Sequence, residues 1–197
     1  DYCHFVKVEK VDAPEENEVI DIPEGLYDFV VTNVDELNAA LDVAGTSSDR
    51  NTIFVMNGTY ELGTEYDTQV KDYTTLVGQS RDGVIIQNHP TTEGIWSSAT
   101  LKTGSNVIIQ NLTLHSIVAY NSSTKAERGT ALYDEGSGNV YKNIRLLGRQ
   151  DTYYSHDNAT SFFEDCEIHG AVDFICGSGN VWFEKCDLMI ESSSSAY

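Results

Sequence analysis

Short apolar segments recur at similar intervals along this chain, separated by polar positions. The segment at 84–88 (VIIQN) returns unchanged at 107–111, and looser versions follow at 140–144, 163–168 and 183–188. Self-similarity at such a period is typical of solenoids, in which each repeat forms one coil. The pattern predicts an all-β protein built as a parallel β-helix.

One small polar position in each repeat lies between apolar neighbours, which suggests side chains stacked at an inward turn of successive coils. Buried amides there would bond up and down the stack. We therefore expect 84–88 and 107–111 to lie on adjacent parallel strands. An antiparallel sandwich of short strands is the alternative, and the exact repetition argues against it. The aligned positions are Asn88, Asn111, Asn143, Cys166 and Cys186, with an inserted loop between the second and the third.

The N-terminal part predicts a lead and a cap. Residues 1–27 form an acidic lead or strap with two prolines, and 28–197 form the β-helix domain. Asn33 and Glu36 resemble a capping pair, and apolar residues at 34, 37, 40 and 41 give a helical stripe. Such a short helix could close the open end of the first coil. Residues 53–56 then predict a strand and 57–58 a turn.

The charge balance limits the partners. With 12 Lys and Arg against 31 Asp and Glu, the net charge of −19 would repel nucleic acid. An acidic polysaccharide would have to be partly neutral, for instance as esters, or meet a local basic cluster. The candidates are Lys125, Arg128, Arg145 and Arg149, which could equally be a solvated loop face.

The sequence shows neither a membrane span nor a signal peptide, and it leaves the redox state of the cysteines open. No apolar run reaches the roughly 18 residues that a bilayer span requires, and no signal-peptide pattern opens the chain, so we expect a soluble monomer with no membrane partner. Cys166 and Cys186, one coil apart, could form a disulfide or stacked thiols. We favour reduced thiols, since no secretion signal requires the other choice.

The sequence lacks the motifs of serine hydrolases of the α/β-hydrolase kind and of zinc enzymes. Gly-x-Ser-x-Gly is absent, so a serine nucleophile of the α/β-hydrolase kind has no setting. His-Glu-x-x-His is also absent, and Cys166 with His169 lacks a second matching pair, so we expect neither a metal nor another cofactor.

Two aspartates provide the candidate chemistry. Asp151 lies in Gln-Asp-Thr at 150–152, and Asp173 lies about one repeat later in Gly-Ala-Val-Asp-Phe-Ile-Cys-Gly at 170–177. Residues one coil apart stack on adjacent strands about 5 Å from each other. Two carboxylates at that range push their proton affinities apart, so the pair can divide acid and nucleophile roles.

The segments 148–156 (GRQDTYYSH) and 170–177 (GAVDFICG) resemble the two central signatures of the pectin methylesterases, and weaker similarity extends from 29–41 and 53–60 through 98–100 to 188. The resemblance covers nearly the whole chain. It implies a right-handed parallel β-helix, secreted to an extracellular or periplasmic space. The implied reaction is hydrolysis of galacturonosyl methyl esters of pectin (homogalacturonan) to pectate and methanol.

The resemblance also implies residue roles. Asp173 would be the nucleophile, Asp151 the general acid and then base, and Gln150 a hydrogen-bond donor to the oxyanion. These roles agree with acyl-enzyme chemistry, in which one carboxylate attacks while the other holds a proton for the leaving methoxide. The sugar subsites would be shaped by Thr100, Tyr153, Val172 and Phe174.

The chain departs from the family pattern at two places. Arg128, in Arg-Gly-Thr-Ala-Leu at 128–132, stands where members of the family usually carry a second amide. As a permanent cation it could hold the oxyanion or a substrate carboxylate, unless it is a loop arginine facing solvent. The chain also stops before the coils that in the family bring an Arg and a Trp to the site, so we expect a C-terminally incomplete domain.

Three functions remain open from the sequence. The first is an active pectin methylesterase. The second is a polysaccharide-binding β-helix that has lost essential groups, and methanol release set beside retention on a pectin column would separate these two. The third is a β-helix glycosidase with two carboxylates, although glycosidic chemistry gives no reason for Gln150 beside the acid.

Overall fold

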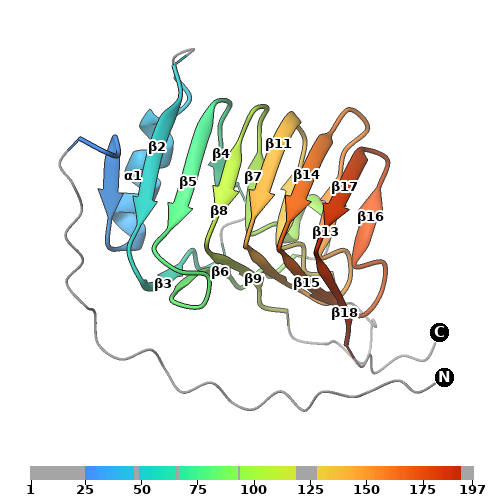
Figure 1. The fold of residues 1–197 in the computed structure, drawn as a ribbon. Coiled ribbons are helices and arrows are strands. Elements are labelled where there is room, and N and C mark those ends of the chain that lie inside the picture. The colour runs from blue at the N-terminus through green and yellow to red at the C-terminus, as the bar shows by residue number, and fades with distance from the viewer. Residues whose placement is uncertain (1–24, 47–48, 65–66, 93, 119–127, 192–197) are drawn as a thin grey trace.

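The computed structural model describes residues 25–46, 49–64, 67–92, 94–118 and 128–191. Its strands wind into a right-handed parallel β-helix whose coils stack along one axis (Figure 1). The stack runs from β1 (Phe29–Val31) at one end to β16 (Ile175–Gly177), β17 (Asn180–Glu184) and β18 (Asp187–Ile190) at the other. Every strand pair within the described ranges is parallel, which excludes the antiparallel sandwich.

Each complete coil contributes one strand to each of three sheets, whereas the first and last described coils contribute to fewer. The seven-stranded sheet runs β1 (Phe29–Val31), β2 (Asn51–Val55), β5 (Thr74–Gly78), β8 (Ile108–Gln110), β11 (Ser137–Lys142), β14 (Thr160–Glu164), β17 (Asn180–Glu184). The six-stranded sheet runs β3 (Gly58–Glu61), β6 (Val84–Asn88), β9 (Thr113–Ser116), β12 (Arg145–Leu147), β15 (Glu167–Gly170), β18 (Asp187–Ile190). The five-stranded sheet runs β4 (Gln69–Val70), β7 (Leu101–Thr103), β10 (Leu132–Asp134), β13 (Tyr153–Ser155), β16 (Ile175–Gly177).

The core is a set of stacked rows, because parallel strands in register place equivalent side chains directly above one another. One row of the seven-stranded sheet runs from coil to coil through side chains that are buried up to Phe163 and half-buried at Phe183. Its aromatic members pack ring on ring, with centroids 4.5 Å apart for Tyr141 and Phe163 and 5.0 Å for Phe163 and Phe183. Every coil therefore depends on its neighbours for burial. The row is Ile53, Leu76, Ile109, Tyr141, Phe163 and Phe183.

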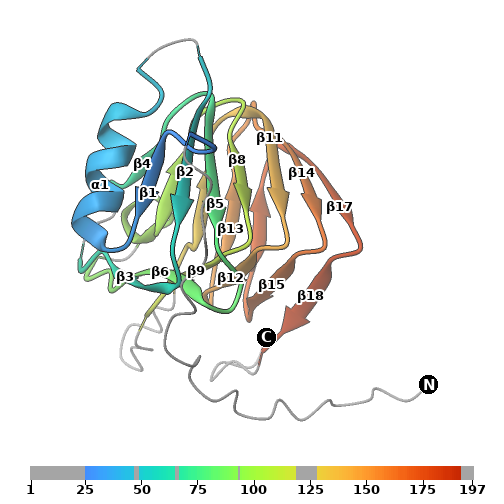
Figure 2. The ribbon, with the colours of Figure 1, turned by 60° about the vertical axis from the view of Figure 1, so that its left-hand side comes forward.

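The predicted capping helix is confirmed as α1 (Val34–Val43), which lies at the N-terminal end of the stack beside β1 (Figure 2). The Asn33 side chain accepts a hydrogen bond from the Glu36 backbone N–H, which satisfies one of the free donors of the first turn. Leu37, Ala40 and Leu41 are buried against the first coil. The helix thus covers apolar surface that the first coil would otherwise expose.

The predicted pairing of the identical pentapeptides is wrong. The first copy is β6 of the six-stranded sheet, whereas the second contains β8 of the seven-stranded sheet, so Asn88 does not lie above Asn111. Ile86 is in register with Leu114, and Val77 with Gln110, so each coil here is longer than the interval between the two pentapeptides. A step of that shorter interval therefore leads to another sheet. Alternating apolar and polar residues specify a strand but not which sheet it joins.

A polar stack does exist, at the corner between the seven- and six-stranded sheets. The Asn143 side-chain amide donates to Asn111 Oδ1 over 3.0 Å. The next members are Asp165 and Lys185, and all four residues have left-handed backbone with φ between 48° and 58°. Asn and Asp adopt this conformation more readily than most residues, which explains their place at the corner.

The structure confirms the predicted pairing of Cys166 with Cys186 but not the predicted neighbour on the preceding coil. Cys166 lies in register with Cys186, as predicted, but its partner on the preceding coil is Ile144 rather than Asn143. Both cysteines are free thiols. Burial raises the pKa of Cys166 to about 12, so this thiol stays protonated at neutral pH. Most of the predicted lead, residues 1–24, and Lys125 lie outside the described residues.

The described ranges contain no helix that is both long and apolar enough to cross a membrane.

Candidate active site

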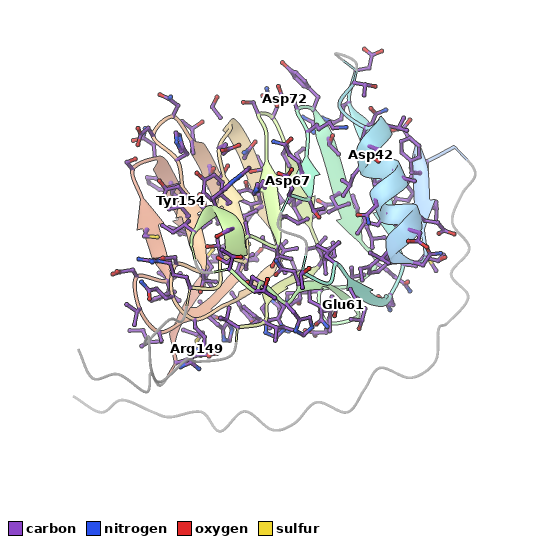
Figure 3. The ribbon with its side chains drawn as sticks, turned by 180° about the vertical axis from the view of Figure 1, so that it is seen from behind. Asp42, Glu61, Asp67, Asp72, Arg149 and Tyr154 are labelled. Atoms are coloured by element: carbon purple, nitrogen blue, oxygen red, sulfur yellow. The ribbon has the colours of Figure 1, made fainter. Side chains whose placement is uncertain are left out.

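Three consecutive coils place Arg128, then Gln150 with Asp151, then Val172 with Asp173 side by side, just before β10, β13 and β16. Single parallel bridges join Arg128 to Gln150 and Gln150 to Val172. Because the bridge at Gln150 and the pairing of Tyr153 with Ile175 have the same offset along the chain, Asp151 lies opposite Asp173. Figure 3 views the molecule from this side and labels Tyr154 on the five-stranded sheet, with Arg149 lower in the view.

Asp151 and Asp173 share a backbone conformation but differ in exposure. Their φ angles are 59° and 44°, in the left-handed region that few side chains other than Asn and Asp enter. The Asp151 N–H donates to the Val172 carbonyl over 3.1 Å, which ties the two turns together. Asp151 is 4% exposed, whereas Asp173 is exposed to solvent. Backbone of this kind is often found at functional sites.

The Asp151 carboxylate has two donors. Arg128 Nε donates to Oδ2 over 2.8 Å, and the Cys176 thiol faces Oδ1 at 3.6 Å. Burial raises the pKa of Asp151 above its ordinary value, and the negative charge of Asp173 adds to the rise, while Arg128 and Cys176 act in the opposite direction. Burial and the two aspartates raise the pKa of Cys176 to about 12, so it remains a thiol donor.

Gln150 is half-buried at the same turn. Its backbone carbonyl accepts from the Gly129 N–H over 2.9 Å, which fixes the residue between two coils. Among the described residues we find no hydrogen bond to its side-chain amide. The amide can therefore donate to a ligand without breaking an internal bond.

The structure places two of the expected subsite residues in the core. Thr100 is fully buried, and its hydroxyl donates to Asn88 Oδ1 over 2.8 Å. Tyr153 is also fully buried, and its hydroxyl donates to the buried Asp134 carboxylate over 3.0 Å. Neither side chain reaches the outer face. Val172 and Phe174, by contrast, are half-buried on either side of Asp173.

Sequence reasoning missed an aromatic pair on the outer face of the five-stranded sheet. Tyr133 and Tyr154 stack with centroids 4.9 Å apart at 24°. Trp96 meets the edge of Tyr133 at 5.9 Å and 69°. Strict alternation along β13 was the available signal, because Tyr153 takes the core position of Leu132 and its neighbour must face outward.

The three described members of the predicted basic cluster have different surroundings. Arg145 lies on β12 of the six-stranded sheet and is held by Asp82 and Glu167, each at 2.7 Å. Arg149 lines a separate hollow of about 250 Å³ with His115 and Glu191. Arg128, a third member, forms an ion pair with Asp151.

A metal site has no support in the part of the chain that the structure describes, where no group of three or more His, Cys, Asp or Glu side chains could hold an ion.

Comparison with known proteins gives one family. The family model for pectinesterase matches residues 13–196. Pectinesterase A of Emericella nidulans is 29% identical over 161 residues, covering 78% of this chain and 48% of that protein. The peach (Prunus persica) pectinesterase/pectinesterase inhibitor PPE8B is 28% identical, covering 80% of this chain and 30% of that protein. The chain thus spans half or less of the length of these two relatives.

Solved structures agree with the fold. The pectin methylesterase PemA of Erwinia chrysanthemi superposes with a TM-score of 0.68 at 26% identity, over 87% of this chain and 57% of that one. The pectin methylesterase of Yersinia enterocolitica gives 0.65 at 30% identity, over 76% and 53%. A pectin methylesterase crystallised in complex with a hexasaccharide gives 0.70 at 25% identity, over 87% and 57%.

Proposed function

Because this chain belongs to the pectinesterase family, we propose that it hydrolyses methyl esters of galacturonosyl units in pectin, giving methanol and pectate. The observation that carries the proposal is the pair formed by Asp151 and Asp173 on adjacent coils. One carboxylate is buried with a raised pKa, and the other is exposed where a polymer can reach it. Such a difference in environment suits an acid and a nucleophile.

In the proposed first step, a carboxylate oxygen of Asp173 attacks the ester carbonyl carbon. The tetrahedral intermediate collapses to an acyl-enzyme, and Asp151 gives its proton to the departing methoxide, so methanol leaves. In the second step, Asp151, now ionised, removes a proton from a water molecule that attacks the acyl group. Asp173 is released as a carboxylate, and Asp151 is protonated again.

Gln150 supplies the electrostatic part of the proposal. Negative charge develops on the carbonyl oxygen when Asp173 attacks, and a fixed amide donor aimed at that position lowers the barrier by about 3 kcal/mol. The half-buried amide of Gln150, bonded to no described residue, is available for this task. A glycosidase would not need this donor, which favours the esterase over the two-carboxylate glycosidase.

The outer face of the five-stranded sheet would carry the polymer. Tyr133 and Tyr154 offer a stacked aromatic surface next to the aspartates, and aromatic faces pack well against the C–H faces of sugars. Val172 and Phe174 would contact the unit that is being hydrolysed. The net charge of −19 disfavours ionised galacturonate, so the expected ligand is a methyl-esterified stretch of homogalacturonan.

The proposed location of the protein follows from its proposed substrate. A cell-wall polymer lies outside the cytoplasm, so we place the protein as secreted, extracellular or periplasmic. All the groups that the mechanism uses come from one chain, and we propose that it acts as a monomer without a cofactor.

The test is methanol release from highly esterified pectin, with unesterified polygalacturonate as the control substrate. We expect methanol from the first and none from the second, without new reducing ends from either. Retention on immobilised pectin without methanol would instead identify a binding protein. New reducing ends without methanol would identify a glycosidase.

A further inference from the structure

The contact between Arg128 and Asp151 joins a permanent cation to the proposed acid. Arg128 Nε lies 2.8 Å from Asp151 Oδ2, within charge-assisted hydrogen-bond range. The Asp151 side chain is 5% exposed, while that of Arg128 is 39% exposed. The backbone bridge between Arg128 and Gln150 holds the arginine one coil away from the acid. The backbone pairing of adjacent coils therefore keeps the two side chains close to each other.

The two oxygens of the Asp151 carboxylate contact different side chains. Arg128 occupies Oδ2, and the neutral Cys176 thiol on β16 faces Oδ1. Asp173, on the next coil, is the other charge that acts on this carboxylate. Oδ1 is consequently the oxygen that can gain and lose a proton while Oδ2 keeps its hydrogen bond from Arg128.

We propose that Arg128 is a positioning residue that acts through Asp151, fixing its orientation and setting the pH range over which it carries the proton for the leaving group. This inference rests on the proposed function and differs from a role of Arg128 on the substrate. The cation favours the ionised carboxylate, whereas burial and Asp173 favour the protonated one. Without the cation, Asp151 would hold its proton to higher pH.

The test compares the wild type with Arg128→Gln, which keeps a hydrogen-bond donor and removes the charge. The first measurement is a carbon-13 NMR titration of the Asp151 carboxyl in protein labelled at the aspartate side-chain carboxyl, assigned with Asp151→Asn. We expect the Asp151 midpoint to rise by about one pH unit in Arg128→Gln, since a near cation lowers a carboxyl pKa by about 1–3 units and this one is partly exposed. Lys142→Gln, which removes a charge from the exposed face of the seven-stranded sheet, should leave the midpoint unchanged.

The second measurement is kcat/KM for methanol release against pH. The alkaline limb reports loss of the proton from the acid, so it should move to higher pH in Arg128→Gln, in step with the NMR midpoint. Equal midpoints in the wild type and Arg128→Gln would overturn the inference, whatever the activity. A raised midpoint with no methanol from either protein would support the coupling of Arg128 to Asp151 and count against the proposed function alone.

Discussion

Tyr153 and Tyr154 are neighbours on β13 but face opposite sides of the five-stranded sheet. Tyr153 is fully buried and donates to the Asp134 carboxylate, whereas Tyr154 is half-buried and stacks on Tyr133. The same side-chain type therefore serves the core at one position and the outer face at the next. Substitutions at the two positions should affect different properties, substrate binding at Tyr154 and stability at Tyr153.

For Tyr154→Ala we expect KM for esterified pectin to rise about fivefold, because loss of an aromatic stacking surface removes about 1 kcal/mol of binding. The turnover number should change little, since Tyr154 has no contact with the aspartates among those we observe. Steady-state methanol release measures both. An unchanged KM would remove Tyr154 from the substrate surface.

For Tyr153→Phe we expect a loss of stability instead. The change deletes one of the donors to the buried Asp134 carboxylate, which keeps those from Ser161, Thr103 and Asn139, and a single hydrogen bond contributes about 0.5–1.5 kcal/mol to stability. Urea unfolding should show a lower midpoint, with KM close to that of the wild type. A raised KM with unchanged stability would mean that Tyr153 contacts the sugar, as the resemblance to the family first suggested.

The fold was predictable from the sequence because each coil repeats one local pattern. Alternation and repeat length gave parallel coils, and Asn33 with Glu36 gave the capping helix. The partner of each strand was not predictable. Coils between β5 and β11 are longer than those after β11, since Val77 pairs with Gln110 whereas Phe163 pairs with the much nearer Phe183. The repeat interval showed the inserted loop between Asn111 and Asn143, but it did not show that the coil from β5 to β8 is also long, because the two identical pentapeptides suggested a shorter one.

The site was predictable where two motifs lie one coil apart. The spacing of Asp151 and Asp173 falls in a region of nearly constant coil length, so the motifs align. Thr100 was harder to place, because its direction depends on a bond to Asn88, on an earlier strand of another sheet. The ion pair between Arg128 and Asp151 depends on side-chain rotamers, which the spacing cannot supply.

Gln150 offers a test of the oxyanion role. Gln150→Ala should lower the turnover number by about a hundredfold, the size of effect found when an oxyanion donor is removed, with little change in KM. Gln110→Ala, on the seven-stranded sheet, serves as the control and should retain wild-type kinetics. A loss of less than about threefold in Gln150→Ala would assign the amide another task.

The raised pKa of Asp151 makes a prediction about stability. Folded protein binds this proton more tightly than unfolded protein. Protonated Asp151 therefore contributes to the free energy of unfolding at low pH, and this contribution is lost as the pH rises above the ordinary aspartate range. Asp151→Asn does not titrate. Its melting temperature relative to the wild type should therefore increase between about pH 3.5 and pH 7.

Thermal unfolding monitored by circular dichroism across that range measures the difference. Asp187→Asn, at an exposed position of β18, is the matched control and should show no such trend. A difference for Asp151→Asn that is constant or shrinks with rising pH would contradict a buried acid with a raised pKa.

The proposed mechanism depends on Asp173 as the nucleophile and Asp151 as the acid of one reaction. Methanol release from esterified pectin by Asp173→Asn, Asp151→Asn and the wild type separates these two roles. We predict background rates for Asp173→Asn, because an amide cannot form the acyl-enzyme, and a loss of about a hundredfold or more for Asp151→Asn with pectin binding retained. Near-wild-type methanol release by both variants would show that neither carboxylate has the role proposed for it.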